Sequence, residues 1–240
     1  MRGIYWKTTS SLLLLIISFA TTFGQYKEGV ITYERRTNLF KKYDGNVREW
    51  LKEKNKIKID IFELSFTDTS SIFRVQDSDL SEEFSWATSK NVVKRDLNSP
   101  NYYAIKDVWG DQVHISDVLP KRDWKLTESK RNIAGYDCRK AFWEVNDSLK
   151  IYAWYCDEII PSVGPETFYG LPGAILGLAS EDGSVIYFAK SVALKQPKAD
   201  VFKIKTSKKA KPLAEIRESI ELVMSRNKWW KSNIEHFFIW

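Results

Sequence analysis

The chain has 240 residues, of which 43% are hydrophobic and 28% charged, and its formal net charge is +6. These values fit one domain with a sizeable hydrophobic core. Beyond the N-terminal segment no apolar run approaches the roughly 20 residues that a membrane-spanning helix needs, which excludes a helical membrane protein with several spans.

The N-terminal segment has the features of a secretory signal peptide. Arg2 and Lys7 form a short basic region, and Ser11–Ala20 is an apolar stretch that is too short to span a bilayer. Small residues precede Gln25, as cleavage requires, and no cysteine follows that could carry a lipid anchor. We expect removal of residues 1–24 on export, which leaves the mature chain in the periplasm or associated with the outer membrane.

Short β-like runs separated by turn residues dominate residues 28–194. In Lys56–Ile61 charged residues alternate with Ile57, Ile59 and Ile61, which predicts a strand whose isoleucines form the buried face. Similar runs are Gly29–Arg36, Glu63–Phe66, Ser71–Val75, Asn101–Ala104, Gln112–Ile115, Trp124–Glu128 and Asn132–Tyr136. Together with the hairpins described below, about ten strands predict a mainly β fold: a single curved antiparallel sheet, an open barrel or a sandwich, with a C-terminal helix.

Two cysteines lie in a hairpin whose register can be worked out. The runs Asp137–Val145 and Leu149–Asp157 flank a short polar turn at Asp147. A hairpin centred there pairs side chains that fit each other: Glu144 with Lys150, Phe142 with Tyr152, Lys140 with Trp154, Trp143 with Ile151, Ala141 with Ala153 and Val145 with Leu149. The same register places Cys138 opposite Cys156.

We predict a disulfide between Cys138 and Cys156. Opposed residues in antiparallel strands have Cα atoms about 4.5–5.5 Å apart, a separation that a disulfide tolerates, and the export compartment is oxidising. A redox-active pair would need the Cys-x-x-Cys spacing, which is missing. A metal site would need further ligands, and the sequence contains only His114 and His236 as histidines.

Residues 164–178, GPETFYGLPGAILGL, combine turn residues with an apolar run. Pro172 fixes φ near −65° and Gly173 can take a positive φ, so we expect a tight turn that leads into a buried strand from Ala174 to Leu178. This strand should pair with Ser184–Val192 across an Asp-Gly turn. The motif residues are Gly164, Pro165, Gly170, Leu171, Pro172 and Gly173.

Two helices are expected, a short one at Asn46–Lys54 and a clearer one at Pro212–Arg226. In the second, apolar residues recur at helical spacing and should bury against the sheet: Leu213, Ile216, Ile220 and Val223. We therefore divide the mature chain into a β domain, residues 25–194, and a C-terminal part, residues 195–240, made of basic linker, helix and aromatic tail.

The C-terminal part is basic and ends in large aromatic residues. It contains eleven Lys or Arg against five Asp or Glu, which suits phosphate, anionic lipid, an acidic partner or a solvated surface; export makes nucleic acid the least suitable partner. The aromatic residues are Trp229, Trp230, Phe237, Phe238 and Trp240. Either this tail packs back onto the sheet, or it docks onto a partner or a membrane surface.

Three segments resemble the GLPGLI family of secreted bacterial proteins. They are Phe62–Val75, Ile133–Ala141 and Ile151–Leu178, and the resemblance extends over residues 29–194. Cys156 stands where the family more often has threonine, so the disulfide need not be a family trait. The order of elements is also similar to the lipoprotein-carrier type of fold, in which a curved sheet surrounds an apolar groove.

The resemblance implies a partner rather than an activity. Members of the GLPGLI family have no established function, and their genes are often neighbours of TonB-dependent outer-membrane receptors. It therefore implies an exported binding or accessory protein for such a transporter. A periplasmic carrier of an apolar ligand or lipid is the alternative.

An enzyme is the third alternative, and few residues of the sequence are candidates for a catalytic role. The adjacent carboxylates Glu82-Glu83, Asp157-Glu158 and Glu181-Asp182 would point to opposite faces of a strand. His114 is isolated, and His236 has no Ser or Cys nucleophile beside it. We therefore expect no catalytic residues, no metal and no cofactor.

Overall fold

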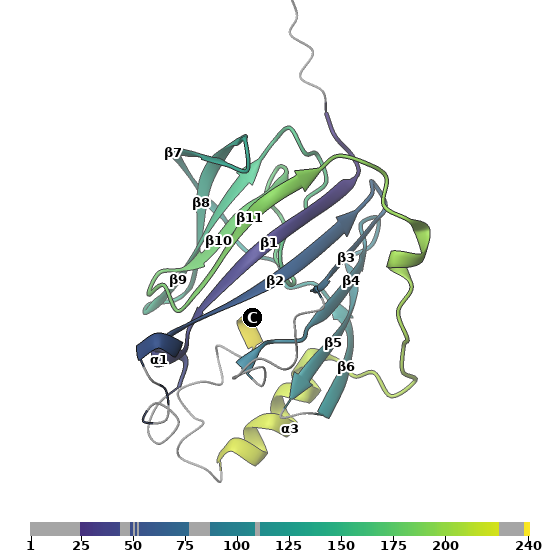
Figure 1. Cartoon of the computed structure of the whole chain (residues 1–240). Coiled ribbons are helices and arrows are strands. Elements are labelled where there is room, and N and C mark those ends of the chain that lie inside the picture. Colours follow the sequence, from purple (N-terminus) through teal and green to yellow (C-terminus); the bar gives the residue numbers. More distant parts are fainter. Residues whose placement is uncertain are drawn as a thin grey trace, which may run out of the picture.

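The computed structural model describes residues 25–43, 49, 51, 53–76, 87–108, 111–225 and 238–240. Eleven antiparallel strands form one sheet in the order β6-β5-β4-β3-β2-β1-β11-β10-β9-β8-β7, and β6 and β7 are its edges (Figure 1). The predicted mainly β fold is thus confirmed, in the form of a single open sheet.

The strands are β1 Gly29–Asn38, β2 Ile57–Phe66, β3 Ser70–Val75, β4 Val92–Asp96, β5 Asn101–Val108, β6 Asp111–Val118, β7 Lys125–Ile133, β8 Tyr136–Asn146, β9 Leu149–Cys156, β10 Ala174–Ser180 and β11 Val185–Ala193. The helices are α1 Leu39–Lys42 and α3 Leu213–Ser225, with 3₁₀ turns at Glu53–Asn55 and Ala199–Phe202. Among the described residues, no helix is long and apolar enough to cross a membrane.

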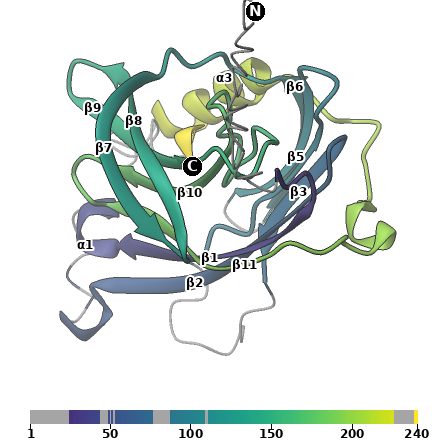
Figure 2. The ribbon, with the colours of Figure 1, turned by 90° about the horizontal axis from the view of Figure 1, so that it is seen from above.

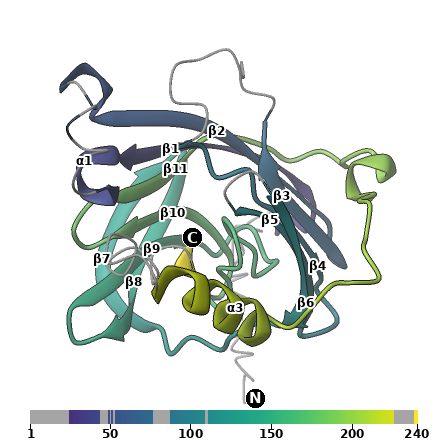
Figure 3. The same cartoon turned by 90° about the horizontal axis from the view of Figure 1, so that it is seen from below.

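The sheet curves so that one face is concave (Figures 2 and 3). The coil between β9 and β10 and the C-terminal residues lie inside the curve, and α3 lies at one open end beside β6. Stacked and edge-on rings fill the middle of the concave face: Tyr33, Phe62, Phe73 and Tyr187. The core of the protein is therefore inside the curve of the sheet.

Strand β2 reverses the predicted face. Ile57 and Ile59 are 45% and 50% exposed, whereas Lys58 and Asp60 are buried. The reason lies farther along the strand, where Phe62 and its alternate neighbours are in the core. Since side chains alternate with a period of two, every even-numbered residue of β2 must point inward. The expected burial of the isoleucines at 57 and 59 is wrong for this reason.

Two further details of the sheet differ from the sequence prediction. The expected strand Asn132–Tyr136 is interrupted by a turn, in which Ala134 and Gly135 have φ of 52° and 89°, and this turn connects β7 to β8. Strand β4 was not predicted, because its sequence, VVKRD, is short and three of its five residues are charged. Of the expected helix Asn46–Lys54, the described residues include a 3₁₀ turn that starts at Glu53.

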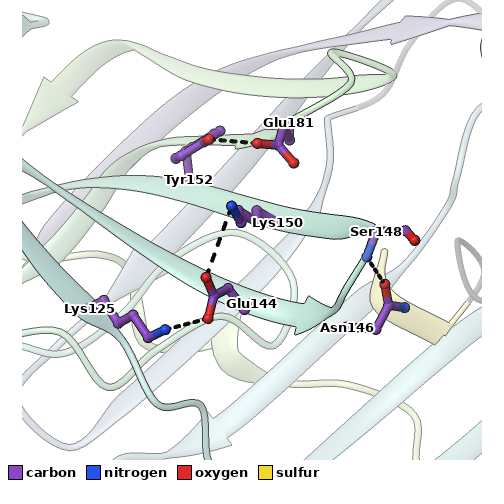
Figure 4. Close-up of polar contacts among 7 residues, drawn as sticks. All are labelled: Lys125, Glu144, Asn146, Ser148, Lys150, Tyr152 and Glu181. Carbon is purple, nitrogen blue, oxygen red and sulfur yellow. Dashed lines mark hydrogen bonds and ion pairs between the residues drawn. The ribbon is translucent and has the colours of Figure 1, made fainter.

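The β8–β9 hairpin has the predicted register over most of its length, including Glu144 opposite Lys150 and Phe142 opposite Tyr152. Figure 4 shows Glu144 between two lysines, because Lys125 of β7 also pairs with it. At the turn the register shifts, so that Asn146 rather than Val145 is opposite Leu149.

The C-terminal helix buries only part of its predicted apolar face. Ile216 and Ile220 are buried and Leu213 is half-buried, but Val223 is 53% exposed. The linker before the helix adds to the sheet, because Lys211 forms a parallel bridge with Ile115 of β6.

We predict that Gly173→Ala strongly destabilises the protein. Gly173 has φ of +137°, and a Cβ there would lie 2.0 Å from the carbonyl oxygen of Cys156. Gly183→Ala is the matched control, because Gly183 also has a positive φ (67°) but has open space around it. We expect about 1–2 kcal/mol of destabilisation for the control and clearly more for Gly173→Ala. Denaturant unfolding measures both, and equal midpoints would contradict the prediction.

Candidate functional site

The most unusual feature of the structure is the charge on the concave side of the sheet. Among the described residues, five cationic and two anionic side chains are buried: Arg35, Lys58, Arg95, Lys106, Arg122, Asp60 and Glu166. A buried charge is costly unless it is paired and hydrogen-bonded. The contacts of each group therefore show which charges are compensated.

Arg35 of β1 is the largest of the fully buried side chains and is 1% exposed. It is opposite Asp60 of β2 and Tyr187 of β11 in the sheet register. Its guanidinium lies 5.3 Å from the centre of the Tyr187 ring and 5.8 Å from that of Phe62. Its Nε and Nη1 have no hydrogen-bond partner among the described residues. Arg35 is thus a buried cation with aromatic contacts and incomplete hydrogen bonding.

Asp60 is compensated by other groups. Its Oδ1 accepts a hydrogen bond from Lys58 Nζ at 3.0 Å and another from Thr88 Oγ1 at 2.8 Å. The carboxylate opposite Arg35 is therefore paired with the lysine two residues away on the same strand.

Glu166 brings the second carboxylate into the interior from the coil between β9 and β10. Its Oε1 accepts from the hydroxyl of Tyr187 at 2.9 Å, and its Oε2 accepts from Asn91 Nδ2 at 3.0 Å. Its φ of 54° is unusual for a residue other than glycine, and such strain is frequent at functional sites. Burial raises the pKa of Tyr187 well above its usual value, and Glu166 adds to this rise, whereas the positive charge of Arg35 opposes it.

Two buried arginines that are not part of the sequence motif form hydrogen bonds to the coil between β9 and β10. Arg122 donates to the carbonyl oxygen and hydroxyl of Thr167 and lies 4.3 Å from the centre of the Phe168 ring. Arg95 donates to the carbonyl oxygen of Ser162. Burial lowers the pKa of each guanidinium to about 10, so both remain protonated at neutral pH.

Trp240 lies inside the curve of the sheet and is 5% exposed. Its ring is 5.5 Å from Phe168 and 5.9 Å from Tyr187, centre to centre. Lys106 of β5 donates to the main-chain oxygen of Trp240 at 2.8 Å. The indole Nε1, by contrast, is buried and has no hydrogen-bond partner among the described residues.

Of the five aromatic residues of the tail, the structure describes Phe238 and Trp240. Trp240 is buried and its ring packs on Phe168 and Tyr187, as expected if the tail packs back onto the sheet. A contact of the tail with a partner stays a prediction. Phe238 is half-buried beside the Arg217 guanidinium of α3. Trp229, Trp230 and Phe237 lie outside the described residues, as does His236.

The predicted motif residues shape the coil that carries Glu166. Gly173 has the expected positive φ and Gly170 has a φ of 94°. At Gly164 a Cβ would lie 3.0 Å from Ile175 and from the carbonyl oxygen of Phe168, so the coil approaches β10 closely there. Leu171 is buried and Pro172 is exposed; Pro165 accepts a main-chain bond from Phe168. Sequence reasoning chose the supporting residues and missed Glu166 itself.

Cys138 and Cys156 are buried free thiols, so the predicted disulfide is not formed in this structure. The β8–β9 pairing ends with Arg139 opposite Tyr155, one residue short of the cysteines. On the other sides of these two strands, Cys138 is opposite Arg131 of β7 and Cys156 is opposite Ala174 of β10.

The other candidate metal-ligating or catalytic side chains do not lie together in the described part of the chain. No three His, Cys, Asp or Glu side chains among the described residues are grouped as a metal site would require. His114 on edge strand β6 shares a hydrogen bond with the hydroxyl of Tyr103 at 2.8 Å.

Comparison with known proteins gives a similar fold and a short match to a family of unknown function. Residues 143–177 match a family described as "Protein of unknown function (Porph_ging)", and no curated protein matches the chain. Solved structures of PNGF-II in the C2 and P21 space groups are 18% identical to the chain and superpose on 81% and 86% of it, with TM-scores of 0.56 and 0.53. The chain spans 32% and 34% of those PNGF-II chains, so the likeness shows the fold alone.

We predict that the two thiols are present but unreactive in the folded protein. Burial raises the pKa of Cys138 to about 12. At pH 8 only about one such thiol in ten thousand is ionised, and the thiolate is the reactive form. A thiol reagent should therefore detect about two thiols per chain in denaturant without reductant, and none in the native protein. Absence of thiols in the denatured, unreduced mature protein would show instead that the disulfide forms.

A second prediction concerns stability against pH. Burial lowers the pKa of Lys106 to about 8, whereas a lysine in the unfolded chain titrates near about 10.4. Between these values the unfolded state binds more protons, so Lys106 makes stability rise with pH from about 8 to 10. Lys106→Met should remove this contribution, and Lys198→Met, at an exposed lysine, should not. Equal pH slopes for the two variants in denaturant unfolding would contradict the prediction.

Proposed function

We propose that this chain is an exported binding protein without catalytic activity, that it assists a TonB-dependent outer-membrane transporter, and that it is a relative of the GLPGLI family. The match of residues 143–177 to a family of unknown function and the motif at Gly164–Gly173 support the relationship. The signal-peptide features of the N-terminal segment support export.

The observation that carries the binding proposal is a row of aromatic rings on the outer face of the sheet. We call this set the outer aromatic row: Phe142, Tyr152, Trp154 and Phe188. All four are half-buried, and they lie ring beside ring, at 6.4 Å for Phe142 and Tyr152 and at 5.5 Å for Trp154 and Phe188. Partly exposed aromatic rings beside cations are typical of protein interfaces.

Two cations and a glycine lie beside the rings of the outer aromatic row. Lys140 Nζ lies 4.1 Å from the centre of the Tyr152 ring, and the Arg131 guanidinium lies 4.5 Å from that of Phe188. Gly177 of β10 lies between Trp154 and Phe188, and a Cβ there would come within 2.7 Å of the Phe188 ring. The hydroxyl of Tyr152 donates to Glu181 (Figure 4).

A periplasmic carrier of an apolar ligand is the second candidate. It is favoured by the concave face, where the interior is occupied partly by residues 239 and 240 rather than by the strands alone. A carrier would need these residues to leave.

We predict that a TonB-dependent transporter co-purifies with the tagged full-length protein from solubilised outer membrane of the native host. Trp154→Ala combined with Phe188→Ala should reduce the recovered transporter at least tenfold, because it removes two rings of the outer aromatic row. Ile59→Ser is the control, since Ile59 is exposed on β2, four strands away from β9.

Recovery is quantified by mass spectrometry, and circular dichroism checks that each variant is folded. Recovery of no transporter would contradict the partner. Equal recovery with both variants would contradict the surface.

A further inference from the structure

We propose that the concave face of the sheet is a binding site for a small carboxylate joined to an aromatic ring, and that Ile239 and Trp240 occupy this site when the ligand is absent. The inference rests on the proposed binding function and specifies its ligand. Three independent observations carry it: uncompensated charge, a set of rings, and the incomplete fit of Trp240.

The charge of the interior favours an anion. Both buried carboxylates already accept hydrogen bonds from neighbours, Asp60 from Lys58 and Thr88, and Glu166 from Tyr187 and Asn91. Arg35 is left with two nitrogen atoms that have no hydrogen-bond partner among the described residues. A carboxylate is the group that matches a guanidinium most closely, because it can accept two parallel hydrogen bonds.

The position of Lys106 places a second cation near the same point. Lys106 donates to the main-chain oxygen of Trp240, the Trp240 ring contacts Tyr187, and Tyr187 contacts the Arg35 guanidinium. Burial lowers the pKa of Lys106, Glu166 opposes this change, and repulsion from Arg35 adds to it. An anion bound between them would relieve this repulsion. The site therefore offers two cations, one from β1 and one from β5, to a single negative charge.

The rings of the site favour a flat apolar group beside the charge. Tyr187 contacts both the Arg35 guanidinium and the indole of Trp240. The position of the indole is therefore one aromatic ring away from the cation. The indole also packs on Phe168, with the two ring centres 5.5 Å apart. A ligand that places its ring where the indole lies would therefore have its charged group within reach of Arg35 or Lys106.

Trp240 fits this place incompletely. Its main-chain oxygen accepts from Lys106, as a ligand carboxylate would, but it makes no hydrogen bond to Arg35. Its indole Nε1 is buried without a partner among the described residues, which costs free energy. An occupant that leaves buried donors unsatisfied on both sides can be displaced by a ligand that satisfies them.

The test uses N-acetyl-L-tryptophan as the probe and its uncharged amide as the matched control ligand. Trp240→Ala in the full-length protein should bind the acid at least tenfold more tightly than the amide, and at least tenfold more tightly than the unaltered protein does. Arg35→Met added to Trp240→Ala should lower the affinity for the acid at least tenfold and leave that for the amide unchanged. Arg36→Met, at an exposed arginine that follows Arg35 on β1 and points away from the interior, should change neither affinity. Equilibrium dialysis measures the affinity of the unaltered protein and of each variant for the acid and for the amide.

Folding is measured separately. Arg35→Met alone should keep or raise the melting temperature, because an apolar residue replaces an incompletely paired buried charge. If Trp240→Ala does not fold, Trp240→Leu, which retains more apolar volume, takes its place. A folded variant that binds acid and amide equally, or whose affinity for the acid does not depend on Arg35, overturns the proposal.

The outcome is distinguishable from that of the transporter experiment. Arg35 faces the interior and the outer aromatic row faces outward, so Arg35→Met should leave recovery of the transporter unchanged. Loss of acid binding with normal recovery would be the expected result. Normal recovery with no acid binding in any variant would overturn the ligand site and leave the proposed partner intact.

Discussion

The alternation of β1 and β2 is the constraint on which the rest of this structure depends. Tyr33 and Phe62 are opposite each other at the centre of the core, and every second residue of both strands shares their face. The strands cannot bury these rings without also burying Arg35 and Asp60, which are the next pair along the ladder. The charged interior is thus a direct consequence of strand geometry.

A further buried carboxylate reaches this interior from coil. Glu166 reaches Tyr187 and Asn91 from the segment between β9 and β10, which in turn is held by Arg95 and Arg122. The glycines and prolines of this segment give it a course that regular structure could not follow. The conspicuous sequence motif therefore supports a site whose charged groups lie mostly on other elements.

The sequence predicted the fold well where local chemistry dominates. The β8–β9 register followed from pairs such as Glu144 with Lys150, and the turn at Gly173 followed from Pro172. The sequence could not predict that Lys58 points inward, because the local alternation favours burial of the isoleucines. The burial of Phe62 farther along the strand determines which of the two faces of β2 points inward. Places where local pattern and fold disagree are often functional.

The interior site was missed for a similar reason. Its members are far apart in the sequence and come from β1, β5, β11, a coil and the C-terminal end, so no spacing reveals them. Arg35 is one charged residue in an ordinary strand pattern. Only the assembled sheet shows that its guanidinium is buried beside Tyr187.

The two edges of the open sheet bear on how the protein behaves at high concentration. An unprotected edge strand invites pairing with another copy and growth into fibres. On β6, Lys211 occupies main-chain positions through bonds with His114 and Ser116. On β7, exposed Lys130 and Arg131 place like charges where a second β7 would have to approach. The protein therefore combines a large open sheet with two edges that resist pairing with a second copy.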